Sequence, residues 1–205
     1  RERERERERE MAVIKVAAIC GSLREASFNR GLIRAAIQLS KEEVDGVEIE
    51  NVDISDLPML NTDLEVAGTY PPVIEAFRQK ILEADAILFS SPEYNYSVTP
   101  LLKNALDWGS RPPNVWGDKA AATISVSGGN TGVRSQYHLR QIGVFLDLHF
   151  INKPELFIGA YAPPAKVDFA TGDLVDAATK GKLKEVIVSL RDFARRLQAG
   201  KPNES

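Results

Sequence analysis

Short apolar runs along the chain alternate with longer segments in which apolar residues recur every three or four positions. The short runs are typical of strands buried on both faces of a parallel sheet, and the longer segments are typical of amphipathic helices. The pattern predicts five strands: 14–19, 47–52, 86–89, 121–126 and a fifth that begins near His149 and is interrupted at Pro154. It predicts helices at 30–39, 72–82, 100–108, 133–146 and 180–197.

Five successive β/α units predict an α/β fold of the flavodoxin-like class, a three-layer sandwich around a five-stranded parallel sheet of order 2-1-3-4-5. In an open sheet of this kind, a ligand binds beyond the carboxyl ends of the strands, where the strand order reverses. That point lies between the first and third strands. We therefore expect a site at the loops that follow strands one, three and four.

The loop after the first strand is typical of a phosphate-binding site. Gly21, Ser22, Arg24, Ser27 and Asn29 stand directly before a predicted helix. Such a loop offers backbone N–H groups, hydroxyls and a guanidinium, and the helix adds the positive end of its dipole. The spacing matches neither the dinucleotide fingerprint nor the nucleotide-triphosphate loop. The favoured ligand is therefore a mononucleotide such as FMN.

The loop after the third strand combines aromatic rings with polar groups. Pro92 restricts the local backbone, and Tyr94 and Tyr96 can cover a planar ring. Glu93 and Asn95 can form hydrogen bonds with the polar edge of that ring. The alternative for the two tyrosines is that they cap the core.

The loop after the fourth strand begins with Ser127 and carries three glycines within five residues, Gly128, Gly129 and Gly132. Without Cβ atoms, these positions allow backbone amides to approach a flat ligand closely. All three loops lie at the same end of the predicted sheet. Together they would supply a phosphate seat, an aromatic polar edge and a closely approaching backbone.

Composition and charge limit the other possibilities. Residues 1–10 are five Arg-Glu repeats, which we interpret as an added, disordered leader before a single FMN-binding domain over 11–205. A net charge of −3 argues against a nucleic-acid partner. No apolar run approaches the roughly 18 residues of a membrane-spanning helix. The single cysteine, Cys20, fits a cytoplasmic location, and His138 and His149 form no metal-spaced cluster, so no metal is expected.

With these motifs the chain resembles the NADPH-dependent FMN reductases of flavodoxin-like fold. The resemblance rests on G-S-L-R-x-x-S-F-N after the first strand, P-E-Y-N after the third and Ser-Gly-Gly after the fourth. It runs from about Val13 to Leu197 and is closest to the plant NAD(P)H:quinone oxidoreductases and bacterial quinone and chromate reductases, above all in 92–113 and 135–147. Asn130 and Thr131 are a departure, because a loop richer in glycine is expected there.

The resemblance implies non-covalent FMN, with NADPH or NADH as the electron donor. It implies no catalytic side chain, because flavin N5 carries the hydride. The expected FMN-binding residues are Gly21, Ser22, Arg24, Ser27, Phe28, Asn29, Pro92, Glu93, Tyr94, Asn95, Ser127, Gly128 and Gly129.

The expected function is two-electron, ping-pong reduction of quinones to hydroquinones by NAD(P)H. Azo compounds, chromate and free flavin are further candidate acceptors, and Arg111 is a candidate contact for the 2′-phosphate of NADPH. One alternative is a flavodoxin-like electron carrier that binds FMN without oxidising NAD(P)H. Such a carrier usually presents a strongly acidic docking face, whereas this chain is near neutral. Another alternative is a flavin-binding scaffold with a regulatory role.

The family resemblance also implies a homo-oligomer, either a dimer or a homotetramer. Relatives bridge their subunits through an R-x-x-Y pattern, which Arg134 and Tyr137 match here, with Glu155 as their candidate partner. The alternative is that 136–145 belongs to an ordinary amphipathic surface helix.

Overall fold

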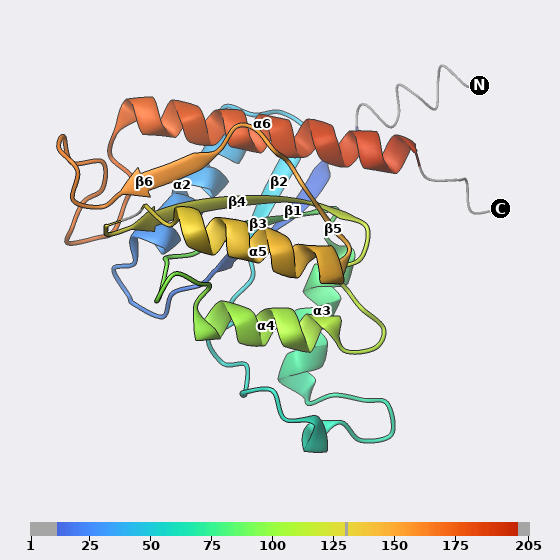
Figure 1. Cartoon of the computed structure of the whole chain (residues 1–205). Coiled ribbons are helices and arrows are strands. Elements are labelled where there is room, and N and C mark those ends of the chain that lie inside the picture. Colours follow the sequence, from blue (N-terminus) through green and yellow to red (C-terminus); the bar gives the residue numbers. More distant parts are fainter. Residues whose placement is uncertain (1–11, 130, 201–205) are drawn as a thin grey trace, which may run out of the picture.

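The computed structural model describes residues 12–129 and 131–200, so the predicted leader lies outside the described residues. Within them, parallel strands form one sheet in the order β2-β1-β3-β4-β5, and β6 also pairs with β4 (Figure 1). The predicted flavodoxin-like strand order is therefore confirmed. The strands are β1 (Ile14–Cys20), β2 (Val47–Asn51), β3 (Ala86–Ser90), β4 (Lys119–Ser127), β5 (Leu148–Phe150) and β6 (Leu156–Gly159).

Each predicted helix is present, although two begin earlier than the apolar periodicity predicts. They are α2 (Phe28–Glu42), α3 (Pro72–Glu83), α4 (Pro100–Ser110), α5 (Val133–Leu146) and α6 (Ala177–Ala199), with a short 3-10 turn, η1 (Thr62–Leu64), in the link between β2 and α3. No helix in the described ranges is long and apolar enough to cross a membrane.

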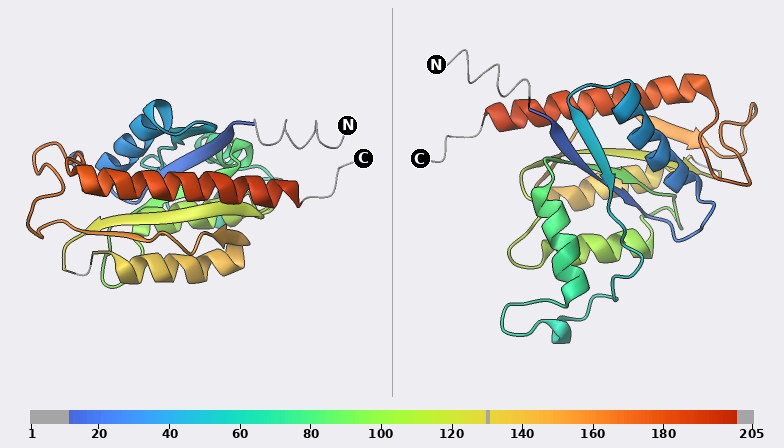
Figure 2. Two further views of the ribbon diagram at one scale, coloured as in Figure 1. Left: turned by 90° about the horizontal axis from the view of Figure 1, so that it is seen from above. Right: turned by 180° about the vertical axis from the view of Figure 1, so that it is seen from behind.

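Helices cover both faces of the sheet, which gives the predicted three layers (Figure 2). Alternate residues of β1 point to opposite faces, as in any strand. Val16 and Ala18 pack in the cluster that contains α2 and α6, whereas Ala17 and Ile19 pack in the cluster that contains α3, α4 and α5. Because both faces are buried, the strand reads as a continuous apolar run.

The fifth strand is divided, as the sequence predicts at Pro154. β5 pairs with the beginning of β4 at Lys119–Ala121, and β6 pairs with its end at Ile124–Ser127. Proline has no backbone N–H to donate to a neighbouring strand, so the ladder is interrupted there. The result is that β6 reaches the carboxyl edge of the sheet beside β4.

Two helices begin earlier than predicted because polar caps add a first turn that the apolar pattern does not reveal. Ser27 is the N-cap of α2, and its hydroxyl oxygen accepts from the backbone N–H of Arg30. Asp176 is the N-cap of α6, and its carboxylate accepts from the N–H of Thr179 at 2.7 Å. Such caps satisfy N–H groups that have no partner within the helix.

A buried arginine joins α3 to the segment that follows α4. Arg78 is only 4% exposed. Its guanidinium donates to the carbonyls of Trp108 and Arg111, both at 2.9 Å, and to that of Pro113 at 2.8 Å. The Tyr70 ring lies 4.5 Å from the guanidinium carbon. Arg78 therefore fixes the turn after α4 through backbone carbonyls.

We predict that Arg78→Met lowers the free energy of unfolding by about 3 kcal/mol, because it leaves several buried carbonyls unpaired. Urea unfolding followed by circular dichroism measures this loss. The matched control is Lys80→Met on the same helix, where the exposed Lys80–Glu50 ion pair is removed with little effect on stability. Equal unfolding midpoints for the two variants would contradict the role given to Arg78.

Candidate functional site

A cavity of about 220 Å³ lies where the loops after β1, β3, β4 and β6 meet. This is the edge of the sheet at which the strand order predicts a ligand. Of the thirteen predicted site residues, ten line this cavity, and Gly21, Asn95 and Gly129 do not. The ten are Ser22, Arg24, Ser27, Phe28, Asn29, Pro92, Glu93, Tyr94, Ser127 and Gly128.

The phosphate cradle predicted after β1 is a loop held mainly by its own hydrogen bonds. The Arg30 side chain donates to the Ser22 carbonyl at 3.2 Å, and the Arg24 N–H approaches the Ser22 hydroxyl at 3.4 Å. Ser27 is the N-cap of α2 and accepts from the Arg30 N–H, whereas the N–H groups of Phe28 and Asn29 have no partner within the helix. The exposed Arg24 guanidinium lies 5.6 Å from the Phe28 ring centre. These groups suit a phosphate.

Asn29 lies in the cradle, but its side chain forms hydrogen bonds with the backbone of β4. Its amide donates to the Val126 carbonyl at 2.8 Å, and its Oδ1 accepts from the Val126 N–H at 3.0 Å. The Ser90 hydroxyl also donates to the Asn29 carbonyl at 3.1 Å. Asn29 therefore offers a ligand its backbone N–H, while its side chain joins α2 to the ends of β3 and β4.

Gly21 has a packing role next to the cavity. Its N–H donates to the Ser90 carbonyl at 2.9 Å, and a Cβ at this position would lie 2.2 Å from the Ser91 hydroxyl. Only glycine allows the loop after β1 to lie this close to the loop after β3.

The loop after β3 contains a tight turn next to the cavity. Asn95 and Tyr96 both have positive φ, 49° and 66°, and Tyr94 and Ser97 exchange both backbone hydrogen bonds across them. Two side chains of α5 hold this turn from outside. The Arg134 guanidinium lies 3.9 Å from the Tyr96 ring centre, and a ring nitrogen of His138 lies 2.7 Å from the Ser97 hydroxyl.

Glu93 lines the cavity and also holds the start of α5. Its carboxylate accepts from the backbone N–H groups of Arg134 and Ser135, at 2.9 and 3.3 Å. Its own N–H donates to the Ser127 hydroxyl at 3.3 Å. The carboxylate is therefore a cap on the N-terminus of α5, where a negative charge is favoured by the helix dipole, and it ties two of the site's loops together.

The loop after β4 presents an open backbone surface. The Ser127 carbonyl accepts from the Ala160 N–H at 2.9 Å. A Cβ built on Gly129 would meet nothing within 4 Å, and one on Gly128 would meet only the Tyr161 ring at 3.9 Å. This surface can accommodate the plane of an isoalloxazine. Of the two residues of the departure, Asn130 lies outside the described residues, and the carbonyl of Thr131 accepts from the Ser125 hydroxyl at 2.6 Å.

The sequence analysis missed one wall of the cavity. Ala160 and Tyr161, which follow β6, line it together with the three predicted loops. The rule that placed the other loops would also have found this one, because it follows the carboxyl end of the fifth strand.

Arg111 lies away from the cavity. α4 begins beside Gly21, where Thr99 caps it, and runs for 11 residues, which is about 16 Å of helix. At the far end, Arg111 donates to Glu65 at 3.0 Å, and this hydrogen bond lowers the pKa of the Glu65 carboxyl. Arg111 therefore does not line the cavity, and its guanidinium is paired with Glu65.

Cys20 ends β1 directly beneath the cradle and is 8% exposed. Burial raises the pKa of its thiol, which is the opposite of what a nucleophilic cysteine needs. In the part of the chain that the structure describes, no three His, Cys, Asp or Glu residues are grouped so that they could hold a metal ion.

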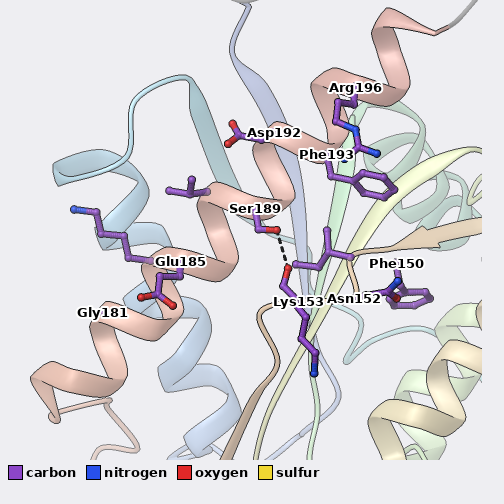
Figure 3. Close-up of a pocket in the computed structure, with 12 residues that line it drawn as sticks. Phe150, Asn152, Lys153, Gly181, Glu185, Ser189, Asp192, Phe193 and Arg196 are labelled. Carbon is purple, nitrogen blue, oxygen red and sulfur yellow. Dashed lines mark hydrogen bonds between the residues drawn. The ribbon is translucent and has the colours of Figure 1, made fainter.

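A larger hollow of about 790 Å³ lies between α6 and the segment 150–153 (Figure 3). There the Ser189 hydroxyl donates to the Lys153 carbonyl at 2.9 Å and ties the helix to that segment. Among the described residues, none from the loops after β1, β3 or β4 lines this hollow. Its place beside the edge strand makes it a weaker candidate than the cavity at the carboxyl edge.

We predict that Glu93→Ala destabilises the protein by about 2 kcal/mol, because it removes the cap of α5 and leaves two N–H groups of that helix unpaired. Glu93→Gln keeps an acceptor oxygen without the charge and should cost about 1 kcal/mol. Urea unfolding measures both losses. Glu48→Gln, at an exposed position of β2, is the control. If Glu93→Ala unfolds at the wild-type midpoint, Glu93 does not hold the two loops.

The sequence profile of the family described as NADPH-dependent FMN reductase matches residues 14–163. The chain is 68% identical to an NADPH:quinone oxidoreductase of Arabidopsis thaliana, across 91% of this chain and 94% of that protein. It is 64% identical to an NAD(P)H:quinone oxidoreductase of Solanum tuberosum, across 91% and 95%. A solved flavoenzyme NAD(P)H:acceptor oxidoreductase of Paracoccus denitrificans has a TM-score of 0.77 and 30% identity, covering 90% of this chain and 98% of that one. The cavity motifs and these similarities lead to one conclusion: the chain belongs to the NADPH-dependent FMN reductase family.

Proposed function

We propose that this protein is an FMN-dependent NAD(P)H:quinone oxidoreductase that reduces quinones to hydroquinones by two electrons. The observation that carries the proposal is the cavity in which a phosphate cradle, an aromatic turn and an open glycine backbone meet at the carboxyl edge of the sheet. The names of the plant relatives support the same activity. Azo compounds, chromate and free flavin are further acceptors that we propose for the same site.

In this proposal the cradle binds the FMN phosphate. Ser22 and Ser27 contribute hydroxyls, and Arg24 contributes a positive charge at the mouth of the cavity. The N-terminus of α2 contributes unpaired N–H groups and the positive end of its dipole. A phosphate can be held in this way without a metal ion.

The loops after β3 and β4 hold the ring. Pro92 and Tyr94 face the cavity from one loop and Ser127 and Gly128 from another, while we place Asn95 and Gly129 at the ring's margin. Bound FMN supplies the redox chemistry, since N5 accepts a hydride from NAD(P)H and the ring passes two electrons on. Backbone amides directed at the pyrimidine edge would stabilise the negative charge of the reduced ring.

The two substrates would bind one after the other. NAD(P)H and the quinone would occupy the same space over the ring in turn, which requires a ping-pong sequence. A flavodoxin-like electron carrier remains the second candidate, because the same cavity would bind FMN without admitting NAD(P)H. The near-neutral charge of the chain favours the enzyme, since a carrier usually docks through a strongly acidic face.

We predict that the purified protein shows a flavin absorbance spectrum that NADPH bleaches under anaerobic conditions and that a benzoquinone restores over many turnovers. This follows from the proposal that NAD(P)H and the quinone reach the bound ring in turn. Absorbance in a sealed cuvette measures each step. Bound flavin that NADPH cannot bleach would instead favour the electron carrier.

A variant links the spectrum to this cavity. Arg24→Gln should weaken FMN binding about tenfold, because a charged hydrogen bond to phosphate is lost at a partly exposed position. Arg196→Gln, which lines the hollow beside α6, is the control. Equal FMN affinity in the two variants would contradict the proposal that Arg24 binds the FMN phosphate.

We further propose that residues 11–205 form one FMN-binding domain that works in the cytoplasm as a homo-oligomer, a dimer or a tetramer. The buried Cys20 fits a reducing compartment. α5 supports the oligomer, because Val144 and Phe145 near its end are 82% and 84% exposed. Tyr137, in the R-x-x-Y pattern with Arg134, already donates to Glu155 of the same chain at 2.8 Å.

We predict that Phe145→Asp shifts the protein toward the monomer, because a charge would be placed in a buried apolar interface. Sedimentation velocity measures the shift. Leu82→Asp on α3, where the side chain is 51% exposed, is the matched control and should leave the oligomer unchanged. A monomeric wild-type protein would instead make α5 an ordinary amphipathic surface helix.

A further inference from the structure

Three aromatic rings form a row beside the cavity. The Phe28 and Phe169 ring centres are 5.5 Å apart and meet edge to face at 87°. Phe169 and Tyr161 are stacked, with centres 5.6 Å apart and planes 20° apart. We call Phe28, Phe169 and Tyr161 the aromatic row. Its two ends, Phe28 and Tyr161, line the cavity that holds the cradle and the glycine loop.

Phe169 lies on a turn that is braced from within. Val167 and Leu174 form an antiparallel bridge, and the Asp168 N–H donates to the Asp173 carbonyl at 2.8 Å. The Asp168 carboxylate accepts from the N–H groups of Ala170 and Thr171 at 2.7 and 3.0 Å. We call residues 166–175 the braced turn. Its backbone has few free groups, so the position of Phe169 is well defined.

The braced turn is also fixed to the cradle helix. A Cβ at Gly31 of α2 would lie 1.9 Å from the carbonyl oxygen of Gly172, so the two backbones touch. Arg34 of α2 donates to the Thr171 carbonyl at 2.9 Å and to the Asp173 carboxylate at 2.7 Å. The turn therefore keeps a fixed distance from the start of α2, where the cradle lies.

Two of the three rings contribute little to the core. Tyr161 is 73% exposed and Phe169 is 50% exposed. The Tyr161 ring also lies 3.9 Å from the Cβ position of Gly128, across the open backbone surface of the glycine loop. Exposed aromatic rings that are grouped beside a cavity are typical of a surface that a ligand or partner covers.

We propose, on the basis of the proposed function, that the aromatic row is a fourth wall of the FMN site that retains the bound flavin. Tyr161 packs its ring against FMN, and Phe169 is a positioning residue that holds Tyr161. The braced turn and α2 keep this wall in register with the phosphate cradle, so that one rigid unit grips FMN at its phosphate and beside its ring.

The test measures the release of FMN from the purified holoprotein, as the rise of flavin fluorescence after dilution, together with the dissociation constant. Tyr161→Ala and Phe169→Ala should each weaken FMN binding about tenfold, which is the scale of one lost aromatic contact. Tyr161→Phe keeps the ring and is the matched control, so it should retain FMN as the wild type does. Arg34→Gln, which does not line the cavity, should also speed release, because it loosens the braced turn.

Two further measurements separate positioning from a general structural effect. If Phe169 acts through Tyr161, the double variant should bind FMN no more weakly than Tyr161→Ala. Phe169→Leu retains an apolar side chain, so the fold is kept while the stacked ring is lost, and release should still be faster than in the wild type. Unfolding midpoints are compared for all variants.

The possible results distinguish a failure of the proposed aromatic wall from a failure of the proposed function. If the wild-type protein binds FMN and Tyr161→Ala releases it at the wild-type rate, the wall is overturned and the quinone reductase proposal stands. The wall is also overturned if these variants change only the KM for the quinone. If the wild-type protein binds no FMN after reconstitution, both the wall and the proposed function are overturned.

Discussion

The site depends on one buried amide. Asn29 joins the start of α2 to the end of β4 through both hydrogen bonds to the Val126 backbone, and it reaches the end of β3 through Ser90. At 3% exposure these bonds are protected from water, so leaving any partner unpaired would carry a full desolvation cost. The cradle, the turn after β3 and the glycine loop share one cavity because this amide holds their supporting elements together.

Other residues of the site also hold its loops together through their own hydrogen bonds and packing. Glu93 uses its carboxylate to cap α5 and its N–H to hold Ser127, and Gly21 is needed for contact with Ser91. Polar side chains that suggest ligand contacts in the sequence thus also connect the loops and helices around the cavity. What remains for the ligand is mainly backbone N–H groups, hydroxyls and aromatic rings, which suits a flat molecule with a phosphate at one end.

Much of the fold could be predicted because the strands and helices have strong periodic patterns, and the interruption at Pro154 has a local cause. The site was predictable at the level of loops, since parallel strands bring their carboxyl ends together. The contacts of individual side chains could not be predicted in this way. Asn29 meets Val126 across 97 positions and Arg111 meets Glu65 across 46, and no local pattern encodes such contacts. Phe169 was missed for the same reason, because its role depends on the approach of Gly172 to Gly31.

The turn after β3 shows why α5 matters to the site. Asn95 and Tyr96 hold positive φ values, which cost an estimated 1–3 kcal/mol each for residues other than glycine, so about this much must be offset elsewhere. The first two turns of α5 provide the offset. Arg134 covers the Tyr96 ring, His138 bonds to Ser97, and the N-terminal N–H groups hold Glu93. A loop that contributes little to the core is thereby fixed by a helix that packs on the sheet. The aromatic face of the cavity is therefore positioned before any ligand binds, and less ordering entropy is lost on binding.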